Sequence, residues 1–151
     1  MSLFSKEKIF NSILVFLITG GWDIVLRNMS EGKLKFFGIE NMKWIRVLKD
    51  YFNLFTVIDA AAVAGIVGFV TYLILSPLFE YLNIQNIIGQ ILLVFLISGL
   101  VGIPMRYSGL FPDLNKYYYE PLGFTYSFIT DAMSGVIVAI TLFTVNYYIY
   151  S

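Results

Sequence analysis

The sequence predicts an all-α protein, a bundle of four transmembrane helices built from two duplicated helical hairpins. Three observations predict this fold. Of the 151 residues, 58% are apolar and only 13% are charged, and the mean hydropathy is +0.77, whereas soluble domains carry about 25% charged residues. The apolar residues gather in four runs long enough to cross a bilayer. One segment, VFLITGGWDIVLR at residues 15–27, returns as VFLISGLVGIPMR at residues 94–106.

The first apolar run, residues 9–26, is expected to be the first span. Lysines before such a run are also typical of a signal peptide, but no small-x-small cleavage site follows it. Residues 28–53 are a polar connector in which apolar residues recur at helical spacing, namely Met42, Ile45, Leu48 and Phe52. Cations recur on another face, namely Lys43, Arg46 and Lys49. This pattern indicates an amphipathic helix, lying either in the membrane interface or on the bundle.

The second run, residues 54–75, is expected to stop at Ser76 and Pro77. It contains Asp59 and then small residues at a spacing of four, namely Ala60, Ala61, Ala64, Gly65 and Gly68. Small residues at this spacing allow two helices to approach closely in lipid. Because this face lies roughly opposite Asp59 in helical projection, we expect partners on two sides, and a second copy of the chain is one candidate.

The third and fourth spans are expected at residues 86–103 and 122–148, joined to the rest by a short turn at 79–85 and a tyrosine-rich loop at 105–121. Pro104 is expected to end the third span. The residues predicted to pack these helices are Gly99, Gly102, Ser134 and Gly135. The run from Tyr117 to Tyr119 is interpreted as an anchor at the lipid–water boundary rather than as a ligand platform.

The cations indicate how the spans are oriented. Counting Arg27 and Arg106, eight of the ten Lys and Arg residues follow the first and third spans, so the positive-inside rule places both large connectors in the cytoplasm. The whole chain is then one integral membrane domain, with repeat halves at about 1–82 and 83–151. Two-span units keep the same orientation, so a pseudo-two-fold axis along the membrane normal is expected.

The repeat also predicts a cluster of buried charges. Arg27 and Arg106 end the first and third spans, and we expect them to neutralise Asp59 and Asp131, in either pairing, because an isolated carboxylate is costly in lipid. Asp23 has Gly102 as its counterpart and is therefore a surplus acid. Such an acid either joins helices structurally or takes up a proton or cation, and the residues leave both alternatives open.

The residue types weigh against an enzyme. Ten Lys and Arg balance ten Asp and Glu, so no basic surface for nucleic acid is expected. The absence of histidine and cysteine from the sequence removes the commonest general base, metal ligand and nucleophile. Asp23, Asp59 and Asp131 are the acids available to a Mg²⁺ ion, but no acid pair has close ligand spacing such as DxxD. We predict a non-enzymatic protein without a cofactor or metal.

Two segments carry a resemblance to known proteins. MRYSGLFPDLNKYYYEPLGF at residues 105–124 and TDAMSGVIVA at residues 130–139 resemble small, uncharacterised multi-span proteins of large nucleocytoplasmic DNA viruses. The resemblance implies a viral inner membrane or an organelle-derived membrane and transfers no functional residue. With it, the sequence predicts a structural or scaffolding membrane protein that contacts lipid, a second copy, or capsid and membrane proteins. The alternative is a small proton or cation channel or transporter using Asp23, Asp59 and Asp131.

Overall fold

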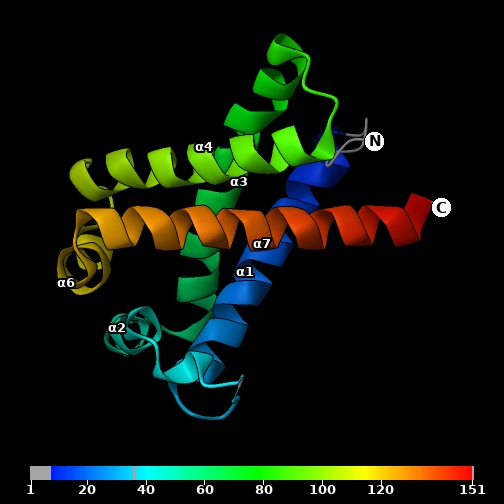
Figure 1. The fold of residues 1–151 in the computed structure, drawn as a ribbon. Coiled ribbons are helices and arrows are strands. Elements are labelled where there is room, and N and C mark those ends of the chain that lie inside the picture. Colours follow the sequence, from blue (N-terminus) through cyan, green and yellow to red (C-terminus); the bar gives the residue numbers. More distant parts are fainter. Residues whose placement is uncertain (1–7, 36, 151) are drawn as a thin grey trace.

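The computed structural model describes residues 8–35 and 37–150, which fold as helices joined by short turns (Figure 1). The long helices in these ranges are α1 (Lys8–Ser30), α3 (Val57–Leu82), α4 (Ile87–Tyr107) and α7 (Phe124–Tyr150). The short ones are η1 (Ile39–Asn41), α2 (Lys43–Phe52), α5 (Pro112–Leu114), the π-helix η2 (Asn115–Tyr119) and α6 (Glu120–Leu122). No strand occurs in the same ranges, so the predicted all-α class is confirmed.

The long helices match the predicted spans in number and order. Within the described part of the chain, four helices are long and apolar enough to cross a membrane. Large apolar side chains on them point outward, including Leu17, Ile66 and Leu92. In water this surface would be costly, whereas lipid covers it without penalty. Length, composition and exposed apolar surface together indicate a multi-pass integral membrane protein.

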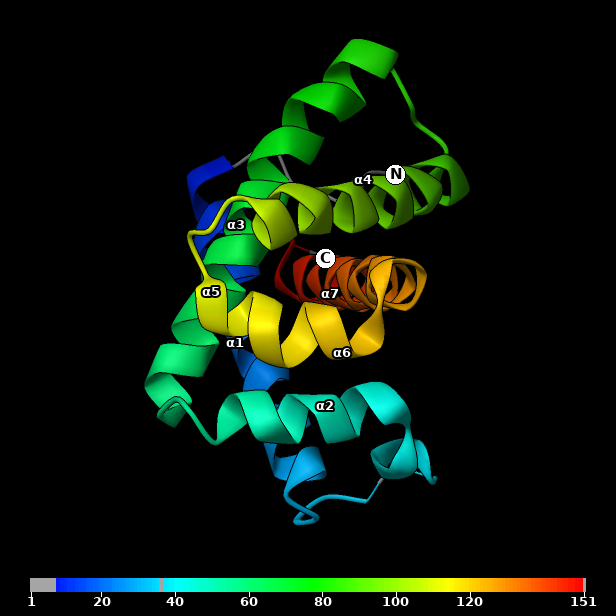
Figure 2. The same cartoon turned by 90° about the vertical axis from the view of Figure 1, so that its left-hand side faces the viewer.

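The long helices pack as two hairpins. α1 lies along α3, and α4 lies along α7, as the predicted halves require. Figure 1 shows that the α4–α7 pair runs steeply across the α1–α3 pair, and Figure 2 shows the same crossing from the side. If one pair follows the membrane normal, the other is therefore strongly tilted.

Two helix ends differ from the prediction, because proline ends neither span. α3 continues through Pro77 to Leu82, and α4 continues through Pro104 to Tyr107. A proline removes one backbone hydrogen bond, but continuing α3 buries Phe79, which is 8% exposed, in a cluster with Val94 and Ala139. The van der Waals packing of Phe79 in this cluster offsets the lost bond.

The two connectors meet at one end of the molecule and pack together, as Figure 2 shows. Residues 112–122 are helical, so the expectation of a loop there is wrong. α2 buries one face, namely Ile45, Leu48, Tyr51 and Phe52. This face joins Met29, Ala60 and the second connector in a single apolar cluster. Of the two alternatives for the amphipathic helix, the structure therefore favours packing on the bundle.

Candidate functional site

Glycines bring α1 and α3 into close contact, as the small-residue pattern predicts. A methyl group added at Gly65 would overlap the ring of Phe16, and one added at Gly68 would overlap the side chain of Thr19. A methyl group added at Gly20 would lie 3.1 Å from the carbonyl oxygen of Ala61, a tight contact without overlap. The small face of α3 is thus occupied by α1. The idea that this face is open to a second copy of the chain is wrong at these positions.

Glycines on α4 and α7 leave room for polar side chains of the opposite helix. A methyl group at Gly102 would overlap Oδ2 of Asp131, and one at Gly135 would overlap the hydroxyl of Ser98. Gly99 receives the ring of Phe128. Ser98 and Asp131 therefore project across the α4–α7 contact, each over a glycine of the other helix.

A cavity of about 120 Å³ lies among the four spans and contains this polar contact. A water molecule needs about 10–15 Å³ by this measure, so the cavity has room for several. Apolar side chains form much of its wall. Its polar lining comes from every span and from η2, namely Thr19, Thr71, Tyr72, Ser98, Tyr119, Asp131 and Ser134. Asp131 is the single carboxyl group in this lining.

Tyrosines of η2 cover Asp131 at one end of the cavity. Tyr118 donates a long hydrogen bond to Oδ1 of Asp131 at 3.4 Å, and its hydroxyl lies 3.0 Å from that of Thr130. Burial raises the pKa of Tyr118 and Tyr119 far above the ordinary value, and the nearby charge of Asp131 raises it further. Both phenols thus remain neutral donors. The expectation that this run is a lipid-facing anchor is wrong for Tyr118 and Tyr119, which are 6% and 4% exposed.

Two polar atoms in the cavity wall have no hydrogen-bond partner among the described residues. They are Oδ2 of Asp131 and the hydroxyl of Ser98, both buried. Leaving a buried polar atom unpaired costs about 1–3 kcal/mol. Because the cavity is roomy and polar at this point, water is the simplest partner for both atoms.

Arg106 and Asp131 lie close together, but the predicted ion pair between them does not form in the described part of the chain. Both residues line a second, smaller cavity of about 10 Å³ between α4 and α7. No ion pair joins them among residues 8–35 and 37–150, and Nη1 of Arg106 has no hydrogen-bond partner there. The guanidinium carbon lies 5.8 Å from the ring centre of Tyr107 instead. The structure brings this pair into one neighbourhood without direct contact.

Arg27 pairs with a residue that the sequence pattern did not single out. Its Nε lies 3.5 Å from Oε1 of Glu31, and its guanidinium carbon lies 5.8 Å from the ring centre of Phe52. Lys33 contacts the same carboxylate at 3.1 Å. The hydrogen bond from Lys33, and after it the charges of Lys33 and Arg27, lower the pKa of Glu31. The expected Arg27–Asp59 and Arg27–Asp131 pairs do not form in the described part of the chain.

Asp59 does not belong to a buried cluster, and this prediction is wrong. The span begins at Val57 rather than 54, so Asp59 lies in the first turn of α3 and is exposed. The Thr56 hydroxyl donates to Oδ2 of Asp59 at 2.8 Å and accepts from the Asp59 amide at 3.2 Å. Thr56 thus caps α3, and the Asp59 carboxylate in the first turn holds the capping hydroxyl and meets the positive end of the helix dipole.

Asp23 is buried, at 9% exposed, but lies outside both cavity linings. Its Oδ2 has no hydrogen-bond partner among the described residues. It lies near Tyr51 of α2, whose pKa is raised by burial first and by the charge of Asp23 second. A tyrosine from a connector therefore lies near each of Asp23 and Asp131.

The packing contacts alter the correspondence between the halves. Two glycine contacts recur in both hairpins: Gly20–Ala61 with Gly99–Phe128, and Thr19–Gly68 with Ser98–Gly135. On this basis Asp131, three residues after Phe128, corresponds to Ala64, three residues after Ala61. Asp59 and Asp131 are thus not equivalent positions of the two halves, although the sequence predicted an arginine partner for each. The duplication itself stays a prediction.

Sequence reasoning missed the tyrosines that cover Asp131 and the part played by Ser98. The hydroxyl–glycine pair shared by the two repeat segments was a usable signal for Ser98. For Tyr118 and Tyr119 the only signal was their place in a connector that must return to the bundle. Comparisons with protein-family models, curated proteins and solved structures found no match.

Proposed function

We propose that this chain is a non-enzymatic multi-pass membrane protein with a structural role, holding a partner protein at the bilayer surface. The observation that supports this best is the docking of α2. Its apolar face is buried in the cluster at the end of the spans, with Ile45 at 0% and Phe52 at 1% exposed. A helix held in this way presents its other face in a fixed orientation.

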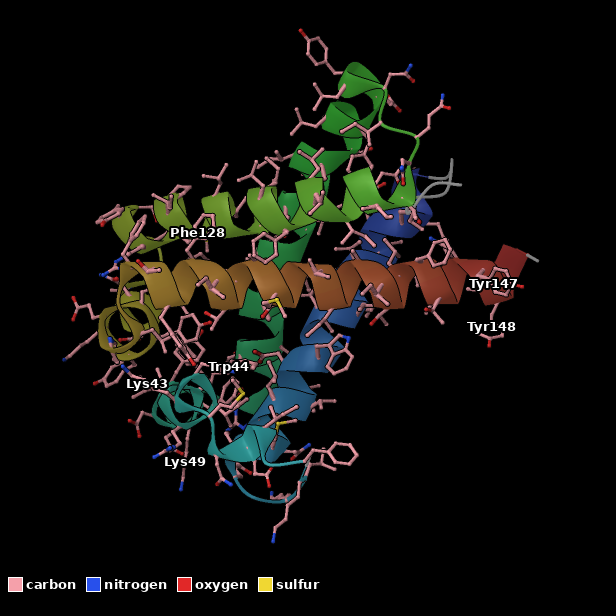
Figure 3. All side chains as sticks on the ribbon, in the orientation of Figure 1. Lys43, Trp44, Lys49, Phe128, Tyr147 and Tyr148 are labelled. Carbon is pink, nitrogen blue, oxygen red and sulfur yellow. The ribbon has the colours of Figure 1, made fainter. Side chains whose placement is uncertain are left out.

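The outer face of α2 is basic. Lys43, Arg46 and Lys49 are exposed on it, and Figure 3 shows Lys43 and Lys49 pointing away from the bundle. Arg46 is held by hydrogen bonds to the carbonyl oxygen of Asn41 at 2.8 and 3.1 Å. A basic face attracts an acidic partner, and Arg46, which is already held in place, loses little side-chain entropy on binding. The partner that this face fits is an acidic protein surface.

The location follows from the same proposal. The resemblance to multi-span proteins of large nucleocytoplasmic DNA viruses favours a viral inner membrane or a host-derived membrane, with the connectors on the side of the protein shell. Mass spectrometry of purified virions and of host membranes tests this location. Recovery of the protein from neither fraction would contradict it.

The structural role is tested by the size of the native complex. The triple variant Lys43→Gln, Arg46→Gln and Lys49→Gln removes the basic face of α2 without touching its buried face. The matched control replaces three exposed lysines elsewhere on the connectors, namely Lys33, Lys35 and Lys116. We expect wild type and control to migrate on native gels as one large complex and the α2 variant as a smaller species. Migration of all three as single chains would refute the role.

A second candidate function, passage of a proton or cation, is supported by the cavity among the spans. It contains one acid and polar groups from all four spans, and it has room for water. In liposomes, dissipation of a pH gradient that is abolished by Asp131→Asn but retained in Lys35→Gln would favour this function. A pH gradient that persists in liposomes containing the wild-type protein would exclude this function.

A further inference from the structure

The wall of the central cavity contains a polar pair that requires an occupant. Ser98 is 7% exposed, and its hydroxyl has no hydrogen-bond partner among the described residues. The same holds for the buried Oδ2 of Asp131. Both residues line the cavity. A buried acceptor with no protein partner is normally satisfied by water or by a bound cation.

The glycine contacts place the two residues about one helical turn apart along the α4–α7 pair. On α4, Ser98 stands four residues before Gly102, which faces Asp131; on α7, Asp131 stands four residues before Gly135, which faces Ser98. Four residues rise about 6 Å along a helix. A water between two oxygens about that far apart can hydrogen-bond to both at about 2.8–3 Å. Sodium bonds oxygen at shorter range, so it would contact one of the two oxygens directly and the other through water.

We propose that this cavity is a binding site for a monovalent cation, held with water between the carboxylate of Asp131 and the hydroxyl of Ser98. Two sources share this chemistry, a proton on the carboxyl–water pair and a sodium ion. The proposal deepens the second candidate function, because a site on a pathway must first bind the ion. It requires binding only, so it can stand where conduction fails.

The surroundings of Asp131 suit one positive charge. From η2, Tyr118 and Tyr119 supply neutral hydroxyls, and from α3, Tyr72 lines the same cavity. From α4, Arg106 adjoins the smaller cavity but makes no ion pair with Asp131 in the described part of the chain. α1 contributes Val15 and Thr19, neither of them charged. One carboxylate without a counter-ion in contact is left to attract the cation.

Two measurements on protein in nanodiscs of neutral lipid separate the sources. The first compares the thermal midpoint in sodium chloride with that in N-methyl-D-glucamine chloride at equal ionic strength. The second records the infrared carbonyl band of a protonated carboxyl group as the pH changes. Sodium binding predicts a higher midpoint in sodium that is lost in Asp131→Asn. Proton binding predicts a band that disappears in Asp131→Asn and persists in Asp23→Asn.

A milder variant guards against misfolding of Asp131→Asn. Ser98→Ala keeps the charge and removes one bond to the cation, so we expect about tenfold weaker sodium binding or a shift of about one pH unit in the band. No sodium effect and no Asp131 band in wild type would overturn the proposal, and so would an unchanged response in Ser98→Ala. Binding without ion flux in liposomes would leave the site standing and refute conduction.

Discussion

Phe52 anchors α2 to the membrane bundle, and its truncation should release that helix. Phe52 is 1% exposed and lies in the apolar cluster that joins both connectors to the ends of the spans. Its ring lies 5.8 Å from the Tyr51 ring centre and 5.8 Å from the guanidinium carbon of Arg27. The variant Phe52→Ala removes all of these contacts and leaves the basic face of α2 chemically intact.

The expected cost follows from this burial. Truncating a fully buried phenylalanine to alanine destabilises a protein by about 3–5 kcal/mol, and the lost cation–π contact adds about 0.5–1 kcal/mol. The lower limit of 3 kcal/mol corresponds to about a hundredfold change in an opening equilibrium. Because Phe52 ends α2 rather than a span, we expect most of this cost in local opening of α2.

Hydrogen exchange of the detergent-solubilised protein measures that opening. Peptides from α2 should exchange about a hundredfold faster in Phe52→Ala, while peptides from α4 and α7 keep their rates. The control is Phe37→Ala, because Phe37 is 100% exposed. Equal α2 exchange rates in the two variants would show that this cluster does not hold α2. Loss of the native complex in Phe52→Ala would connect the anchor with the proposed role.

Three further predictions concern packing, capping and charge. Gly135→Ala should destabilise the fold by about 1–3 kcal/mol because its methyl group overlaps a side chain of α4. Gly21→Ala, whose methyl group meets open space, should be neutral or stabilise the fold by up to about 1 kcal/mol. Thermal midpoints of the two variants and the wild type in detergent test this difference. Thr56→Ala should lower the free energy of unfolding by about 1 kcal/mol because the cap of α3 is lost. Asp59→Ala should lower it by less. A larger loss in Asp59→Ala than in Thr56→Ala would indicate that Asp59 forms a buried ion pair after all. The lowered pKa of Glu31 means that its stabilising effect is present above the ordinary value of 4.5 and is lost as the pH falls below it. Glu31→Gln should therefore flatten stability in that acidic range, and an unchanged pH profile would refute the contacts of Glu31 with Lys33 and Arg27.

Hydropathy was sufficient to predict the spans, because lipid requires long apolar helices with all backbone groups bonded internally. The pairing of α1 with α3 and of α4 with α7 agrees with the repeat halves, whereas the short connector at 79–85 joins α3 to α4, which belong to different hairpins. The helix ends were less predictable. Pro77 looks like a stop in isolation, but burial of Phe79 beyond it carries α3 onward. A helix continues past a proline when the packing of the residues beyond it stabilises the fold by more than the lost backbone hydrogen bond costs.

The sequence by itself determined the all-α class, the order of the spans and the small residues at which helices meet. Tertiary structure decided which charges matter. Asp59 and Asp131 look alike in the sequence, yet Asp59 is exposed in the first turn of α3 beside the capping Thr56, and Asp131 lines a cavity beside tyrosines of η2. The reason is that burial and hydrogen bonding depend on what the rest of the chain places beside a residue. Spacing along one helix does not contain that information.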